Sequence, residues 1–230
     1  MTKSIFQEIR GISRWRSIRR TEQATALDRI LETNAVFVHI PKCGGKSVVF
    51  DLYGLSEHDW FGHAGISFYK SLLGPSRFRK AFKFAFIRDP IARCLSGFKF
   101  RKRGGFGLDN DKTMASELVG LSFEEFVLSG RLSEMVAKDV VFMQQAPFLY
   151  LWDGTLGVDR VCFFENFDKE LRSLPLKLKK TTPSHMNASP REPEWELSMA
   201  TRHMISNIYA QDYQLISRIN HYKTNAISHN

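Results

Sequence analysis

Two short segments of the chain carry the residues best suited to chemistry on an anionic substrate. In the first, Val38–Ser47, two glycines, two lysines and a serine directly follow an apolar run. Glycines let backbone N–H groups converge on an anion, a helix N-terminus adds partial positive charge, and lysine adds a full one. The segment therefore predicts an anion-binding loop made of Lys42, Cys43, Gly44, Gly45, Lys46 and Ser47.

The second segment is Arg88–Phe98. Arg88 follows an apolar run, and Asp89 and Pro90 are typical of a helix cap and a first helical turn. Ser96 lies eight residues after Arg88, about two turns along that helix. An arginine and a serine so placed can bind one phosphate, the arginine through a charge-assisted contact. The competing interpretation pairs Arg88 with a nearby carboxylate.

Three kinds of chemistry use a loop like the first one. A Walker A loop needs a glycine where Ile40 stands, although Gly45-Lys46-Ser47 fits its end. A cysteine phosphatase built on Cys43 needs an arginine soon afterwards, and residues 48–50 are apolar instead. Both interpretations are weakened, which leaves a third.

Residues 39–47, H-I-P-K-C-G-G-K-S, resemble the 5′-phosphosulfate-binding loop of sulfotransferases that use 3′-phosphoadenosine-5′-phosphosulfate (PAPS), commonly H-I-P-K-T-G-G-T-S. Cys43 and Lys46 replace the two threonines. Residues 88–98 resemble the family's 3′-phosphate-binding element, R-D-P-x-x-R-x-x-S-x-[FY]. Gly62-His63 resembles the Gly-His that carries the catalytic histidine in the glycan 2-O-sulfotransferase branch.

The resemblance extends through shorter motifs in the family's order. They are Q-x-x-F-L-Y at residues 145–150, Phe163–Asn166, Asn187-Ala188-Ser189 and Ile208-Tyr209-x-x-Asp212. Each is weak alone, and their order is the evidence.

The resemblance implies a role for each candidate residue. Lys42 would stabilise the leaving group and His63 would be the general base, while Arg88 and Ser96 would hold the 3′-phosphate. The late loop would close over the nucleotide through Asn187, Ser189 and Arg191. It also implies PAPS as donor, PAP as product, no required metal, and a hydroxyl-bearing acceptor, expected to be a glycan or glycolipid.

The elements that must position these residues predict an α/β fold. Apolar runs at 35–40, 82–87 and 158–164 predict strands, each followed by a helical pattern. Because parallel strands need crossover connections, we expect a P-loop-like, three-layer fold with a central parallel sheet flanked by helices. Residues 1–33 predict a basic helical segment, and 34–230 the sulfotransferase domain.

The composition restricts the class of partner and the cellular compartment, but it does not identify the activity. The chain has a net charge of +9, which predicts an anionic partner. A basic nucleic-acid or anionic-surface binding protein is therefore one rival, and a P-loop small-molecule kinase is the other. We expect no nucleic-acid partner, but we do expect peripheral membrane contact through the basic N-terminal helix. The basic run at Lys99–Arg103 is expected to be a solvated face, with residues 101–103 at a solvated helix end, and contact of these three with an acidic acceptor is the alternative. No long apolar run is present, and the three cysteines lack metal-ligand spacing, so a cytoplasmic protein with Cys94 and Cys162 in its core is expected.

Overall fold

The computed structural model describes residues 25–177 and 196–227. These residues form two compact units, each assembled from two stretches of the chain. Among the described residues, the first unit contains those up to Ile87 and those from Pro147 to Lys177, and the second contains Arg88–Ala146 with the C-terminal helices. Residues 1–24 of the predicted basic segment lie outside the described residues, and within its remainder α2 (Ala26–Thr33) is helical as expected.

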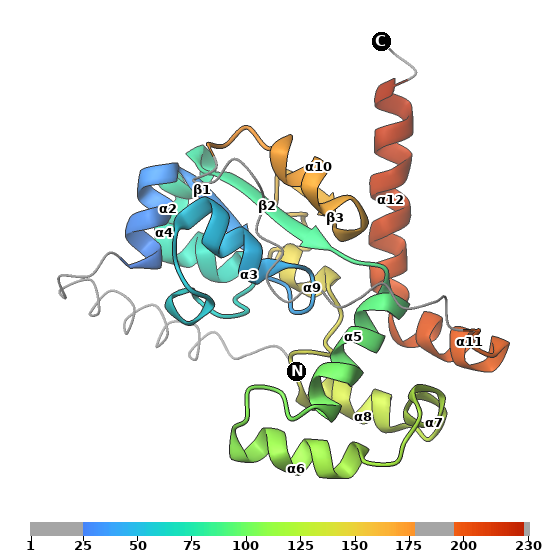
Figure 1. Ribbon diagram of the computed structural model, residues 1–230. Helices are drawn as coiled ribbons and strands as arrows, with labels where there is room; N and C mark the ends of the chain where they lie inside the picture. Colours follow the sequence, from blue (N-terminus) through green and yellow to red (C-terminus); the bar gives the residue numbers. More distant parts are fainter. Residues whose placement is uncertain (1–24, 178–195, 228–230) are drawn as a thin grey trace. The chain divides into compact units, whose positions relative to one another are not determined.

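A parallel sheet forms the centre of the first unit, in the order β1 (Ala35–Val38), β2 (Phe82–Ile87) and β3 (Arg160–Phe163). All of β1 and five of the six residues of β2 are buried, so both faces of the sheet are covered. This confirms the predicted α/β architecture of a parallel sheet flanked by helices (Figure 1).

Within the first unit, helical elements follow β1 and β3 as the pattern predicts. On one face, Phe86 of β2 packs on Phe167 with ring centroids 4.8 Å apart. The helical elements besides α2 are α3 (Gly45–Val48), the π-helical η1 (Val49–Tyr53), η2 (Glu57–Asp59), α4 (Ile66–Lys80), η3 (Phe164–Asn166) and α10 (Phe167–Arg172). The chain returns to this unit through α9 (Ala146–Leu149).

The second unit is helical and has its own apolar core. Its helices are α5 (Pro90–Lys102), α6 (Asp109–Leu118), α7 (Phe123–Leu128), α8 (Arg131–Lys138), α11 (Met199–Ile208) and α12 (Ala210–Ile227). Cys94 and Phe98 of α5 pack with Phe126, Phe142 and Tyr209 in that core. Cys94 is therefore a core thiol, as predicted, and Cys162 is equally buried in β3.

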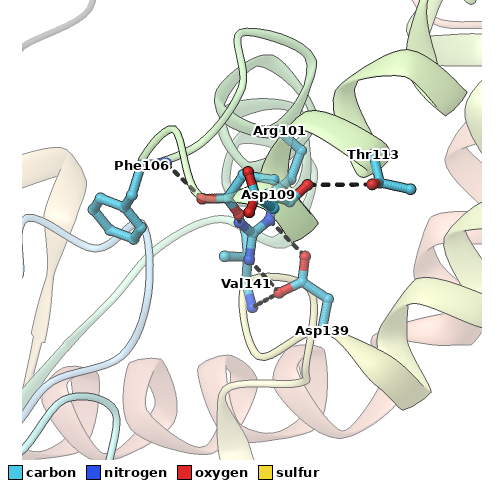
Figure 2. Close-up of polar contacts among 7 residues, drawn as sticks. Arg101, Phe106, Asp109, Thr113, Asp139 and Val141 are labelled. Atoms are coloured by element: carbon cyan, nitrogen blue, oxygen red, sulfur yellow. Dashed lines mark hydrogen bonds and ion pairs between the residues drawn. The ribbon is translucent and has the colours of Figure 1, made fainter.

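The basic run at the end of α5 is partly internal, so the prediction of a solvated helix end is wrong for Arg101. Its side chain is buried between Asp111 and Asp139, and its Nε and one terminal nitrogen each lie 2.7 Å from an oxygen of Asp139 (Figure 2). Backbone N–H groups of Phe106 and Val141 donate to the same two carboxylates at 2.9 and 3.0 Å. The guanidinium thus ties α5 to α6 and to the segment after α8.

We predict that Arg101→Met lowers the free energy of unfolding by about 3–5 kcal/mol, because it leaves two buried carboxylates without their cation. Urea unfolding measures the loss. Lys112→Ala is the control, since Lys112 pairs with Asp109 on the exposed surface and should matter little. A loss under about 1 kcal/mol in Arg101→Met would contradict a supporting role for this cluster.

Candidate functional site

The candidate anion-binding loop lies at the carboxyl end of β1. The chain leaves the strand at Val38, turns through Pro41–Gly44 and enters α3 at Gly45. Two residues of the turn have left-handed backbones, Lys42 with φ 66° and Gly44 with φ 78°. Such a φ is costly for lysine, and strained residues of this kind concentrate at functional sites. Lys42 and Lys46 are half-buried, whereas Cys43 and Ser47 are buried.

Packing explains both glycines. A Cβ on Gly44 would lie 2.8 Å from the ring of Phe167, in addition to the strain of its left-handed φ. A Cβ on Gly45 would lie 1.9 Å from the His39 ring. The loop is therefore pressed against an aromatic neighbour on one side and a histidine on the other, and only glycine fits at either point. The N–H groups of Ser47 and Val48 donate to the carbonyl oxygen of Gly44 at 3.1 and 3.3 Å, so the helix begins directly at the loop, and the N-terminus of a helix favours an anion.

His39 is the buried residue around which the loop turns. Its ring stacks on Phe37, with centroids 5.6 Å apart, and its Nδ1 has no hydrogen-bond partner among the described residues. Burial, followed by the nearby His63 and Lys46, lowers the pKa of His39 well below its usual range. The His39 imidazole is therefore neutral at physiological pH. A neutral ring is compatible with the two lysines of the loop, where an imidazolium would repel them.

His63 is held against the end of β1 by a hydrogen bond. Its Nδ1 lies 2.9 Å from the backbone oxygen of His39, and the two imidazole rings meet edge to face with centroids 4.5 Å apart. A carbonyl oxygen only accepts, so Nδ1 carries the proton and Nε2 of the neutral ring carries the lone pair. The half-buried His63 thus has the tautomer that a general base acting through Nε2 requires.

The second unit contains the other predicted anion-binding residues. Arg88, the first residue after β2, is half-buried, and Ser96 is half-buried on α5. The carboxylate of Asp89 accepts the N–H of Ala92 at 2.8 Å and caps α5, as the sequence predicts. The backbone N–H of Arg88 donates to Oε1 of Gln145 at 2.9 Å.

The two arginines of the R-D-P-x-x-R element have different environments. Arg93 is fully buried, and one of its terminal nitrogens donates to the carbonyl oxygens of Val141 and Met143 at 3.1 and 2.7 Å. Arg93 therefore supports the fold, whereas the half-buried Arg88 is the arginine suited to a ligand. Two of the weak late motifs meet here, because Gln145 bonds to the backbone of Arg88 and Asp212 bonds to Gln145.

The remaining predicted site residues, Asn187, Ser189 and Arg191, lie outside the described residues. Their proposed contact with the nucleotide stays a prediction. Within the described part of the chain, no group of three or more histidine, cysteine or acidic side chains is arranged to bind a metal ion. In the same residues, no helix has both the length and the apolar character needed to cross a membrane.

Comparison with known families agrees with this arrangement. The model of the sulfotransferase family matches residues 31–216, a span that includes β1, the loop, His63, Arg88 and the late motifs up to Asp212. The chain belongs to the sulfotransferase family. It is accordingly a transferase of the sulfuryl group. Neither the comparison with curated proteins nor that with solved structures gave a match.

Proposed function

We propose that the protein transfers a sulfuryl group from PAPS to a hydroxyl group of a saccharide. The observation that carries the proposal is the arrangement around His39. Its ring packs against the glycine loop, and its carbonyl oxygen accepts a hydrogen bond from Nδ1 of His63, so Nε2 is the nitrogen that can take a proton when the ring is neutral. The anion-binding loop and the candidate base are thus anchored on one residue at the end of one strand.

The donor is proposed from the residues of both segments. The loop offers two lysines, a buried serine and the N–H groups that follow Gly44, a set suited to the 5′-phosphosulfate end. Arg88 and Ser96 are suited to a 3′-phosphate, which distinguishes PAPS from ATP. Glycan or glycolipid acceptors are favoured by the resemblance of Gly62-His63 to the glycan 2-O branch.

The proposed reaction is an in-line displacement at sulfur. The acceptor oxygen forms a bond to sulfur while the bond between sulfur and the 5′-phosphate oxygen breaks, releasing PAP. His63 Nε2 takes the acceptor's proton, and the imidazolium so formed keeps its Nδ1–H bond to the His39 carbonyl. Lys42, with Lys46 nearby in the loop, neutralises the charge that grows on the leaving phosphate. These groups require no metal for their chemistry.

We also propose a cytoplasmic setting, which is supported by three buried cysteines that form no disulfide with the described residues.

The kinase and nucleic-acid alternatives predict other ligands, and one binding experiment separates them. A ligand that binds only the folded state raises its melting temperature, so PAP, ATP with Mg²⁺, and a short oligonucleotide can be compared directly.

We predict that PAP in EDTA raises the melting temperature well above the rise given by ATP with Mg²⁺ or by the oligonucleotide. By calorimetry, Arg88→Ala should weaken PAP binding by about 10- to 150-fold, the equivalent of about 1.5–3 kcal/mol for a contact with a charged group. Ser96→Ala should weaken it less.

Arg103→Ala is the matched control, because Arg103 is exposed at the other end of α5. Stabilisation by ATP with Mg²⁺ equal to that by PAP would favour the kinase. Unchanged PAP affinity in Arg88→Ala would remove the 3′-phosphate assignment.

Measuring the turnover of substituted proteins distinguishes the proposed roles of Lys42 and His63. Lys42→Ala should lower turnover more than it lowers PAPS affinity, because interactions that strengthen in the transition state raise the rate. His63→Ala should keep PAP affinity near wild type and lower turnover by roughly 10²–10⁴-fold. The assay uses labelled PAPS with a panel of glycan, phenol and peptide acceptors.

His58→Ala is the control for loss of an imidazole, since His58 is exposed nearby in the chain. Near wild-type turnover in His63→Ala would end its role as base and direct the search to a carboxylate such as Glu165. Transfer to phenol or peptide alone would replace the saccharide assignment.

A further inference from the structure

The side-chain amide of Gln145 is bonded to both backbone groups of Arg88. The Arg88 N–H donates to Oε1 at 2.9 Å, and Nε2 donates to the Arg88 carbonyl oxygen at 2.8 Å. Arg88 has just left β2, whose last paired residue is Ile87, so the sheet itself no longer holds it. A cyclic pair of hydrogen bonds fixes both the position and the rotation of this residue where strand pairing has ended.

The Gln145 amide is itself fixed by Asp212 of α12. One carboxylate oxygen accepts the backbone N–H groups of Gln145 and Ala146 at 2.7 and 2.8 Å, and the other lies 3.3 Å from Gln145 Nε2. Gln145 and Asp212 are each 1% exposed. Because the carboxylate accepts and the Arg88 N–H donates, only one orientation of the amide satisfies both neighbours.

These bonds engage the backbone N–H and carbonyl oxygen of Arg88, and its guanidinium takes no part in them. Arg93, on α5, binds the residues just before Gln145 through the carbonyl oxygens of Val141 and Met143. The segment that leads to Gln145 is therefore held by α5, and Gln145 itself is held by Asp212 of α12. If these hydrogen bonds served only to join the end of β2 to a helix, they would not need to meet at Arg88, the residue that begins the R-D-P element.

We propose that Gln145 is a positioning residue for ligand binding, which holds the Arg88 backbone so that the guanidinium meets the 3′-phosphate of the nucleotide, with Asp212 acting through Gln145. The inference rests on the proposed function, because it takes Arg88 as the 3′-phosphate contact. A guanidinium binds phosphate through directed hydrogen bonds, so a small displacement of its backbone weakens the contact. In this proposal, binding of the 5′ end of the nucleotide does not depend on the hydrogen bonds between Gln145 and Arg88.

The test compares PAP with 5′-AMP, which lacks the 3′-phosphate, by calorimetry on the full chain. Gln145→Met keeps the side-chain length and removes both bonds to Arg88. It should weaken PAP binding about tenfold and change 5′-AMP binding less than twofold. In an Arg88→Ala background it should weaken PAP binding no further, because the two residues act as one unit.

Gln144→Met is the matched control at the adjacent position, where the side-chain oxygen has no partner among the described residues, and it should leave the PAP to 5′-AMP ratio unchanged. Asp212→Asn provides a second variant if Gln145→Met does not fold. It retains one oxygen for the backbone N–H groups and turns an NH₂ toward Gln145, and it should reduce the same ratio about threefold.

Parallel loss of PAP and 5′-AMP affinity, or no loss in either variant while Arg88→Ala still loses PAP, would overturn the positioning role and leave the proposed function standing. Full PAP affinity in Arg88→Ala would instead overturn the 3′-phosphate assignment, and this inference with it.

Discussion

The candidate site depends on the burial of one histidine where β1 ends. His39 stacks on Phe37 within the core, and its backbone oxygen points to His63. Its ring leaves no room for a side chain on Gly45, so α3 begins as close to the strand as the backbone allows. The ring of His39 thus shapes the loop, and its backbone oxygen orients His63. The position agrees with the general preference of open α/β sheets for ligands at the carboxyl ends of strands.

The charged residues of the described chain divide into those that support the fold and those proposed to bind a ligand. Arg93 and Arg101 are buried in the second unit, where they donate to carbonyl oxygens or carboxylates. Lys83 is likewise buried, and its ammonium lies 2.8 Å from Asp159. Lys42, Lys46 and Arg88, by contrast, are half-buried at the carboxyl ends of strands. Net charge alone could not make this distinction, because it counts both groups equally.

Much of the fold could be predicted because local signals were strong. The run at 82–87 forms β2 with those bounds, and the Asp89-Pro90 pair begins α5 as a cap and first turn should. The helix α4 was not predicted, because Gly74 has a non-helical backbone and precedes Pro75, so the helical periodicity is broken in the middle of the element.

Long-range contacts were beyond the sequence. Nothing local indicates that Arg101 meets Asp139, 38 residues away, or that Gln145 meets Asp212, 67 residues away. In the candidate site, the loop and His63 were predicted from motifs, but the bond that joins His63 to the His39 carbonyl required the fold. The late motifs singled out Gln145 and Asp212 as residues shared with the family, but they did not indicate what the two side chains contact.

The most direct test of the account is the protonation state of His63 in the folded protein. With ¹⁵N-labelled histidine, NMR at a pH where the imidazole is neutral distinguishes a protonated from an unprotonated ring nitrogen, and the spectrum of His63→Ala assigns the signals. The account predicts a proton on Nδ1, held by the His39 carbonyl, and a lone pair on Nε2. A proton on Nε2, or rapid averaging between the two nitrogens, would contradict it.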